Sequence, residues 1–172
     1  MPLADIDSLL DDLYDRLSAR ISERNLRNPL LVGIHTGGSW IAERLYPRLV
    51  EAGLISDPLG SLDISFYRDD FTRIGLNPKV KPSDLPVASE DRHIILVDDV
   101  LMSGRTIRAA LNVLFDLGRP ASVTLVTLFD LDANELPIRA DIVGQHLQLP
   151  SHQRIKLTGP EPLGLEIQEI EP

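Results

Sequence analysis

The stretch His93-Ile-Ile-Leu-Val-Asp-Asp-Val-Leu-Met-Ser-Gly-Arg-Thr106 indicates how this chain folds. Its apolar part, 94–97, is short, continuous and rich in β-branched residues, which predicts a strand buried on both faces of a parallel sheet. Two adjacent carboxylates, Asp98 and Asp99, follow where such a strand is expected to end, and a helical pattern begins after Thr106. Because open α/β sheets bind ligands at the carboxyl ends of their strands, we expect a ligand site here.

The residues between this strand and the helix predict a site for a phosphorylated sugar. Ser103-Gly104-Arg105-Thr106 combine hydroxyls, a glycine and a cation at a helix N-terminus, where backbone N–H groups and the helix dipole attract an anion. Unpaired carboxylates would repel a bare phosphate. Carboxylates make sense here if they accept hydrogen bonds from the hydroxyls of the ligand, help to hold Mg²⁺, or stabilise a developing positive charge. A phosphorylated ribose meets these conditions.

A second strand and turn, at 29–39, offer a further anion site. The apolar run 29–34 predicts a buried strand, and the turn His35-Thr-Gly-Gly-Ser39 leads into a helix predicted over 40–49, which Pro47 should bend or end. Glycines let backbone N–H groups approach a phosphate closely. A tight strand-to-helix turn without a ligand is the alternative, and the more frequent one.

The remaining patterns predict a single α/β domain. Apolar residues at helical spacing indicate helices over 5–24 and 107–117, the second ending at Gly118. Strands are predicted at 62–67 and 123–129, followed by strand-like pieces at 141–143, 154–157 and 165–170. We therefore expect a mainly parallel central sheet flanked by helices, with a small β-rich C-terminal hood. The domain spans 1–172, with a core of about 1–130 and a hood mainly at 131–172.

Two charged segments each have two interpretations. The run 68–86 carries three prolines and no sustained period, which favours a loop that closes over a ligand, with a merely disordered connection as the alternative. Arg16, Arg20 and Arg24 recur every four residues and could contact phosphates. Because acidic residues are interleaved with them, a solvated, internally paired helix face is the favoured interpretation.

The composition limits the classes of function. The chain has 17 Lys and Arg against 26 Asp and Glu, a net charge of −9, which opposes general nucleic-acid binding but permits a local basic patch. The absence of cysteine excludes disulfides and thiolate chemistry. No apolar run could span a membrane and no secretory signal is present, so we expect a cytoplasmic protein. None of the four histidines has a carboxylate or histidine at a spacing that suggests a zinc site.

The stretch Val97–Thr106 closely resembles the phosphoribosyl pyrophosphate signature of type I phosphoribosyltransferases. The resemblance implies their fold, with Asp98 and Asp99 contacting the ribose hydroxyls and the metal site, where Mg²⁺ is held mostly through phosphoribosyl pyrophosphate. The residues implied to bind phosphoribosyl pyrophosphate are Val97, Asp98, Asp99, Val100, Leu101, Met102, Ser103, Gly104, Arg105 and Thr106. Pyrophosphate is implied to bind Thr36, Gly37, Gly38 and Arg68, under the loop that follows Tyr67.

Further stretches narrow the resemblance to the PyrR family, which combines regulation of pyrimidine operons with uracil phosphoribosyltransferase activity. They are Leu31–Thr36, Leu62–Asp70, Val97–Thr106, Leu117–Pro120 and Glu135–Asp141. The resemblance implies conversion of uracil and phosphoribosyl pyrophosphate to UMP and diphosphate, with Mg²⁺ as cofactor. It also implies UMP-dependent binding of the pyrimidine operon leader mRNA, and a homodimer or an assembly of dimers.

Within that resemblance, individual residues have expected roles. Asp98, Asp99 and Arg68 are the catalytic candidates, and Arg68 with Arg73 would neutralise the pyrophosphate. Uracil is expected near four residues, Leu136, Pro137, Ile138 and Val143. Met102 stands where purine enzymes typically carry an aspartate, and a thioether cannot take that role, which favours a pyrimidine; plain packing is its alternative function.

Two departures from the family reduce positive charge. Thr36-Gly37-Gly38 stands where relatives commonly have Thr-Arg-Gly, and Asp132-Ala133-Asn134 replaces the Gly-His-Arg of RNA-binding members. Three functions therefore stay open: an enzyme that is also a regulator, a UMP-sensing mRNA-binding attenuator with little turnover, and an enzyme that has lost RNA binding.

Overall fold

The structure, a computed structural model, describes residues 3–64 and 83–171. The predicted closing loop, with Arg68 and Arg73, lies almost wholly outside these residues, as does the second half of the strand predicted at 62–67. Within the described part of the chain, no helix is long and apolar enough to cross a membrane.

A sheet of five parallel strands forms the centre of the molecule, in the order β2-β1-β3-β4-β5. The strands are β1 (Leu30–Ile34), β2 (Gly60–Leu62), β3 (His93–Leu101), β4 (Ser122–Asp130) and β5 (Ile142–His146). All of β1 and residues 94–97 of β3 are buried, as expected for parallel strands with both faces covered. The predicted α/β fold is confirmed.

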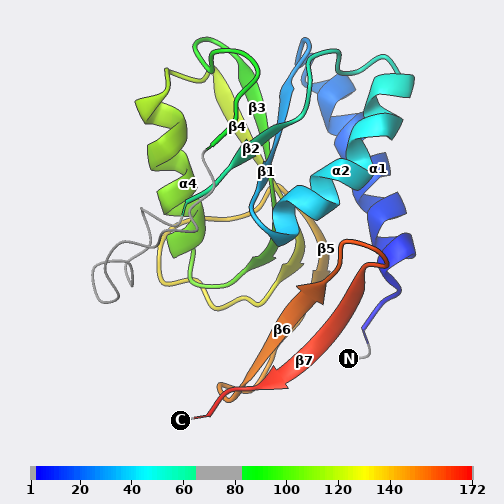
Figure 1. The fold of residues 1–172 in the computed structure, drawn as a ribbon, viewed down its shortest axis with the longest axis vertical. Coiled ribbons are helices and arrows are strands. Elements are labelled where there is room, and N and C mark those ends of the chain that lie inside the picture. The colour runs from blue at the N-terminus through cyan, green and yellow to red at the C-terminus, as the bar shows by residue number, and fades with distance from the viewer. Residues whose placement is uncertain (1–2, 65–82, 172) are drawn as a thin grey trace.

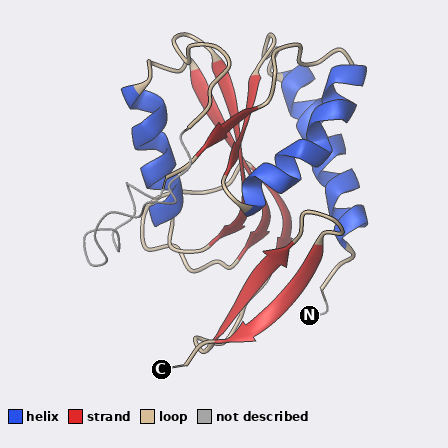
Figure 2. Ribbon diagram, viewed as in Figure 1, coloured by secondary structure: helices blue, strands red, loops and turns tan. Residues whose placement is uncertain are grey.

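Helices cover both faces of this sheet (Figures 1 and 2). Helices α1 (Ile6–Glu23) and α2 (Gly37–Glu51) lie on one side, and α4 (Arg105–Asp116) lies on the other. Asp5 caps α1 by accepting a hydrogen bond from the Ser8 N–H at 3.2 Å. Helix α2 starts three residues before the predicted range and continues past Pro47, so the expectation that this proline could end the helix is wrong.

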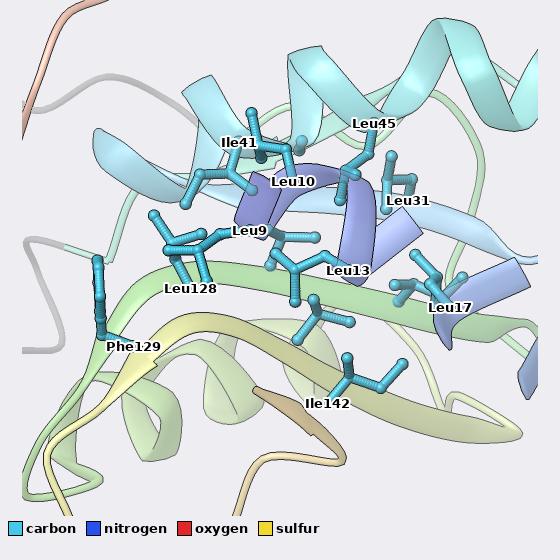
Figure 3. Packing of buried hydrophobic residues seen from close by; sticks show 14 of the residues in the cluster. Leu9, Leu10, Leu13, Leu17, Leu31, Ile41, Leu45, Leu128, Phe129 and Ile142 are labelled. Atoms are coloured by element: carbon cyan, nitrogen blue, oxygen red, sulfur yellow. The ribbon is translucent and has the colours of Figure 1, made fainter. Parts of the chain in front are cut away.

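The larger core cluster joins α1 and α2 to the sheet (Figure 3). Leu13 and Leu17 of α1 are completely buried, and they pack with apolar side chains of β1, β4 and β5. Each such leucine stabilises the fold by about 1.5–3 kcal/mol through burial. On the outer face of α1, Arg16 pairs with Asp12 at 2.7 Å, which agrees with the internally paired face expected from the sequence.

Two strands differ from their predicted extent. β3 continues through both acids to Leu101, because it stays paired with β4 as far as Leu101 and Asp130. Its pairing with β1 stops at Val97. The carboxylates therefore lie where the neighbour β1 ends, while the strand that carries them continues. β2 begins before the predicted range 62–67 and ends at Leu62.

The C-terminal hood contains one strand fewer than predicted. The piece at 141–143 belongs to β5, which pairs in parallel with β4 because Ile142 and Val143 match Val126 and Thr127 in register. The hood consists of the antiparallel pair β6 (Gln153–Thr158) and β7 (Gly164–Glu169), seen below the main sheet in Figure 1. Arg44 of α2 anchors it through Glu161 and the Pro160 carbonyl, both at 2.7 Å.

Candidate active site

The two adjacent acids lie beside the end of β1. Asp98 is buried, with 5% of its surface exposed, and its Oδ1 accepts the Asp99 N–H at 2.9 Å. The Asp99 Oδ1 in turn accepts the Val100 N–H at 2.9 Å. These bonds hold each carboxylate against the strand, and they fix its direction in advance of any ligand.

Two glycines allow the start of α2 to pack against this end of β3. A Cβ on Gly38 would lie 2.3 Å from the Val97 carbonyl oxygen, and a Cβ on Gly37 would lie 2.3 Å from the Asp99 Oδ2. The backbone of the His35–Ser39 turn therefore approaches the acids more closely than any other residue type would allow. The turn predicted to bind pyrophosphate and the acid pair form one continuous surface.

Two neighbouring cavities open at this surface. Cavity A, about 370 Å³, is lined by Thr36, Gly37, Asp98 and Asp99 together with Trp40 of α2. Cavity B, about 450 Å³, is lined by the residues from Asp99 to Gly104, with Thr106, Ile107 and the hood strand β6. The two cavities share Asp99, Val100, Thr106 and Lys156, so one ligand can occupy both.

The turn before α4 has the shape expected of a phosphate cradle. Gly104 adopts a left-handed conformation with φ of 95°, which a side chain would disfavour, and α4 begins at the next residue. The Ser103 Oγ accepts the Arg105 N–H at 3.2 Å. Met102 is 52% exposed and lines cavity B. Backbone N–H groups at the N-terminus of α4 can thus bind an anion beside Asp99.

The residues predicted to bind uracil lie on a different cavity. Leu136, Pro137, Ile138 and Val143 line cavity C, about 600 Å³, which shares no lining residue with cavities A and B. Leu136 and Ile138 nevertheless lie beside Gly104, because a Cβ there would meet them at 3.4–3.5 Å. The structure brings these residues to the back of the cradle, and their contact with a base stays a prediction.

The sequence placed uracil near 135–143 of the hood, but it did not indicate the contribution of strand β6 to the site. Lys156 of β6 lines both cavity A and cavity B, and Arg154 and Ile155 line cavity B. Leu131, which follows β4, lines cavity B as well. The only signal in the sequence was a cation within a predicted strand, and nothing in its spacing linked that strand to the acids.

Comparisons with known proteins identify the family of this chain. Residues 5–156 match the family described as the phosphoribosyl transferase domain. The "Bifunctional protein PyrR" of Nitrosococcus oceani is 57% identical over 97% of this chain and 93% of its own length. The protein of that name from Pseudomonas paraeruginosa is 57% identical over 100% of this chain and 99% of its own.

Solved structures show the same fold in more distant proteins. Hypoxanthine phosphoribosyltransferase from Trypanosoma cruzi, in complex with the product IMP, superposes with a TM-score of 0.63 at 20% identity, covering 83% of this chain and 77% of that chain. A second structure of that enzyme has a TM-score of 0.64 at 22% identity, covering 84% and 74% of the two chains. At this identity the likeness establishes the fold.

Proposed function

The chain belongs to the phosphoribosyl transferase domain family and, within it, to the PyrR family, and on this basis we propose that it converts uracil and phosphoribosyl pyrophosphate to UMP and diphosphate. The observation that carries the proposal is the arrangement of Asp99 between two connected cavities. One cavity has the glycine turn and the other has the phosphate cradle. The acid thus lies where the ribose of a phosphorylated sugar would join its two anionic ends.

Phosphoribosyl pyrophosphate, the donor, has three parts, and in this proposal each part contacts a different group of residues. The 5′-phosphate lies on Ser103–Thr106 at the N-terminus of α4, the ribose hydroxyls donate to Asp98 and Asp99, and the diphosphate group lies against Thr36 and Gly37. Carboxylate and phosphate oxygens are the ligands that Mg²⁺ prefers, so the acid pair fits that ion. When bound, Mg²⁺ neutralises charge on the diphosphate and eases its departure.

The transfer needs no protein nucleophile. The bond from the anomeric carbon to the diphosphate oxygen breaks, and its electron pair leaves with the diphosphate. The bond from that carbon to N1 of uracil forms, and the N1 proton is released. The ribose carries positive charge between these events, and the Asp99 carboxylate stabilises it by electrostatic attraction. Positioning two substrates in contact supplies much of the remaining acceleration. Arg68, which lies outside the described residues, is the proposed cation for the leaving diphosphate.

We place the uracil ring in cavity B, between the cradle and the hood. Leu131 and Ile155 supply apolar surface there, and Met102 offers no group that could recognise a purine. Lys156 contributes a positive charge on both cavities, so it contacts the donor and the acceptor sides of the reaction. Leu136 and Ile138 would support the cradle from behind.

The cradle is also connected to a segment that could report nucleotide binding. The Ser103 carbonyl accepts the N–H groups of Glu135 and Leu136, at 2.9 Å and 3.2 Å, and Arg105 pairs with Glu135 at 3.1 Å. We propose a second function on this connection, in which UMP in the cradle stabilises one position of 132–138 and so promotes binding of the pyrimidine operon leader mRNA. A homodimer or an assembly of dimers is the proposed form.

One experiment tests both functions. Purified protein is assayed for UMP formation from uracil, phosphoribosyl pyrophosphate and Mg²⁺, with hypoxanthine as the control base. Retention of the leader RNA is measured in parallel, with and without UMP, at one stated salt concentration. Turnover with UMP-dependent retention supports the bifunctional proposal. Retention without turnover indicates a sensor, and turnover without retention indicates an enzyme that has lost RNA binding. Activity with hypoxanthine alone would contradict the proposed substrate.

A further inference from the structure

Three metal-ligating side chains converge on the wall of cavity C, away from the active site. Asp130 ends β4 and His146 ends β5, and the two are direct neighbours in the parallel register. Asp132 lies two residues after Asp130 in the chain, and its Oδ1 is 3.0 Å from the His146 Nδ1. One ligand atom from each of the three lies within 4.8 Å of the others. All three residues line cavity C, and none lines cavity A or B.

Asp130 is a buried carboxylate without an external partner. Its exposed fraction is 7%, and its Oδ1 accepts the Asp132 N–H at 2.9 Å, a bond within the cluster itself. Among residues 3–64 and 83–171, no side chain outside the cluster donates to this carboxylate or pairs with it. Because a carboxylate with so little exposed surface is only partly hydrated, it would attract a cation that enters through cavity C.

Two of the three arginines near this wall already have other partners. Arg16 lines cavity C, but it pairs with Asp12 at 2.7 Å and donates to the Val143 carbonyl. Arg20, nearby on α1, pairs with Asp141 at 3.1 Å. Arg139 lines the cavity and is exposed to solvent. Among residues 3–64 and 83–171, no arginine or lysine pairs with the Asp130 carboxylate, so a bound ion can supply its compensating charge.

We propose that Asp130, Asp132 and His146 bind one divalent transition-metal ion of the Zn²⁺ class. An imidazole nitrogen with two carboxylate oxygens is a donor set that suits Zn²⁺, whereas Mg²⁺ favours oxygen ligands in a strict octahedron. Two ligands at about 2.0–2.2 Å from zinc lie about 3–3.5 Å apart, and the 3.0 Å between Asp132 and His146 is close to that value.

Small side-chain rotations complete the geometry. Asp132 and His146 are exposed, so they can turn toward Asp130 without disturbing the core. Three protein ligands leave at least one position for water or for an external donor. The ion would join the ends of β4 and β5 to the segment 132–138, and it would neutralise both carboxylates on this wall.

Zinc titration of the intact chain tests this site. The protein is treated with a chelator and then titrated with ZnCl₂ by calorimetry, with stoichiometry checked by equilibrium dialysis. We expect one Zn²⁺ per chain, and competition by Mg²⁺ only at large excess. Because losing an outer-sphere partner alone weakens metal affinity about 10–100-fold, replacing a ligand in His146→Ala or Asp132→Asn should weaken it at least tenfold.

A histidine elsewhere on the surface provides the matched control. His152 is also exposed and lies 3.6 Å from the Glu169 carboxylate on the hood, so His152→Ala removes an equivalent imidazole and should leave zinc binding unchanged. Thermal unfolding confirms that each variant is folded. The proposal is overturned by the absence of saturable binding, by wild-type affinity in His146→Ala and Asp132→Asn, or by equal loss in His152→Ala.

Discussion

The phosphate cradle and the β4–β5 edge occupy neighbouring parts of one sheet, but they are assembled in different ways. The cradle is a continuous run, from Val97 through Gly104 into α4, in which each residue's place follows from its position along the chain. The β4–β5 edge brings Asp130 beside His146 only because the two strands pair in parallel. A local motif therefore reveals the first site in the sequence, whereas strand register creates the second.

This difference implies that chemistry is concentrated on the cradle side, and Asp99→Asn is the strongest test. Asparagine keeps the size of the side chain and can still accept the Val100 N–H, but it removes the charge that faces the proposed ribose position. We expect the turnover number to fall by about 10²–10³-fold, the loss typical of a preorganised electrostatic contact. Steady-state UMP formation measures it.

Asp15→Asn is the control for charge, because Asp15 is exposed on α1. It should leave turnover unchanged. Equal activities of wild type and Asp99→Asn would mean that the acid pair stabilises the fold and does not act on the ribose. The inference that the chemistry is concentrated at the cradle would then be wrong.

The adjacent glycines Gly37 and Gly38 allow an effect on the active site to be separated from an effect on the fold. Gly37 faces the Asp99 side chain, whereas Gly38 faces the Val97 backbone. In Gly37→Ala the new methyl would lie 2.3 Å from the Asp99 Oδ2 and 2.9 Å from its Cβ, so the carboxylate has to rotate away and the backbone has to shift slightly. A displacement of this size at a reacting centre costs about 10²-fold in rate. We expect that loss of rate with a smaller loss of stability than in Gly38→Ala.

Gly38→Ala is the partner experiment. Its methyl would lie 2.3 Å from the Val97 carbonyl oxygen, which cannot rotate away. We expect the free energy of unfolding to fall by about 1–3 kcal/mol, the usual cost of overpacking. Urea unfolding and UMP formation, measured on both variants, separate the two effects. Identical behaviour of the variants would contradict the assignment of Gly37 to the site.

Lys156 tests whether the hood belongs to the active site. Lys156→Met keeps the apolar part of the side chain and removes the only charge that β6 places on both cavities. We expect the KM for a substrate to rise about tenfold, equivalent to about 1.4 kcal/mol of binding. Lys156→Arg should retain most of the affinity. Unchanged KM values for both substrates in Lys156→Met would place the hood outside the reaction.

Local patterns predicted the central elements well. The apolar run at 94–97, the glycine turn after β1 and the helix ending near Gly118 all appear where periodicity and turn residues placed them. The length of β3 and the place of β5 in the sheet depend on pairing with β4, which local patterns do not contain. β3 continues past Asp99 because β4 extends beside it, and β5 joins the sheet because its apolar residues match β4 in register.

The same limit explains the missed site residues. His146 follows Asp132 by fourteen positions with no second ligand close to either in a recognisable motif, and the two meet only through the parallel pairing of β4 with β5. Lys156 reaches the acids only because the hood folds back over the strand ends. Contacts between segments far apart in the sequence depend on topology, and composition and periodicity do not report them.

The smallest expected effect concerns the ion pair that connects the two regions. Arg105 of the cradle and Glu135 of the 132–138 segment lie 3.1 Å apart, but their side chains are 50% and 61% exposed. Exposed pairs contribute about 0–1 kcal/mol, so Glu135→Gln should lower the free energy of unfolding by less than that, and added salt should abolish the difference. The N–H groups of Glu135 and Leu136 still donate to the Ser103 carbonyl in this variant, and they hold the segment in place. Urea unfolding at low and high salt measures the effect.

A loss of unfolding free energy above about 2 kcal/mol would contradict this expectation, because exposed ion pairs cannot supply so much. It would show that a stronger charge interaction joins the cradle to the β4–β5 edge. The two regions would then behave as one cooperative unit, and zinc at the edge and UMP in the cradle should alter each other's affinity.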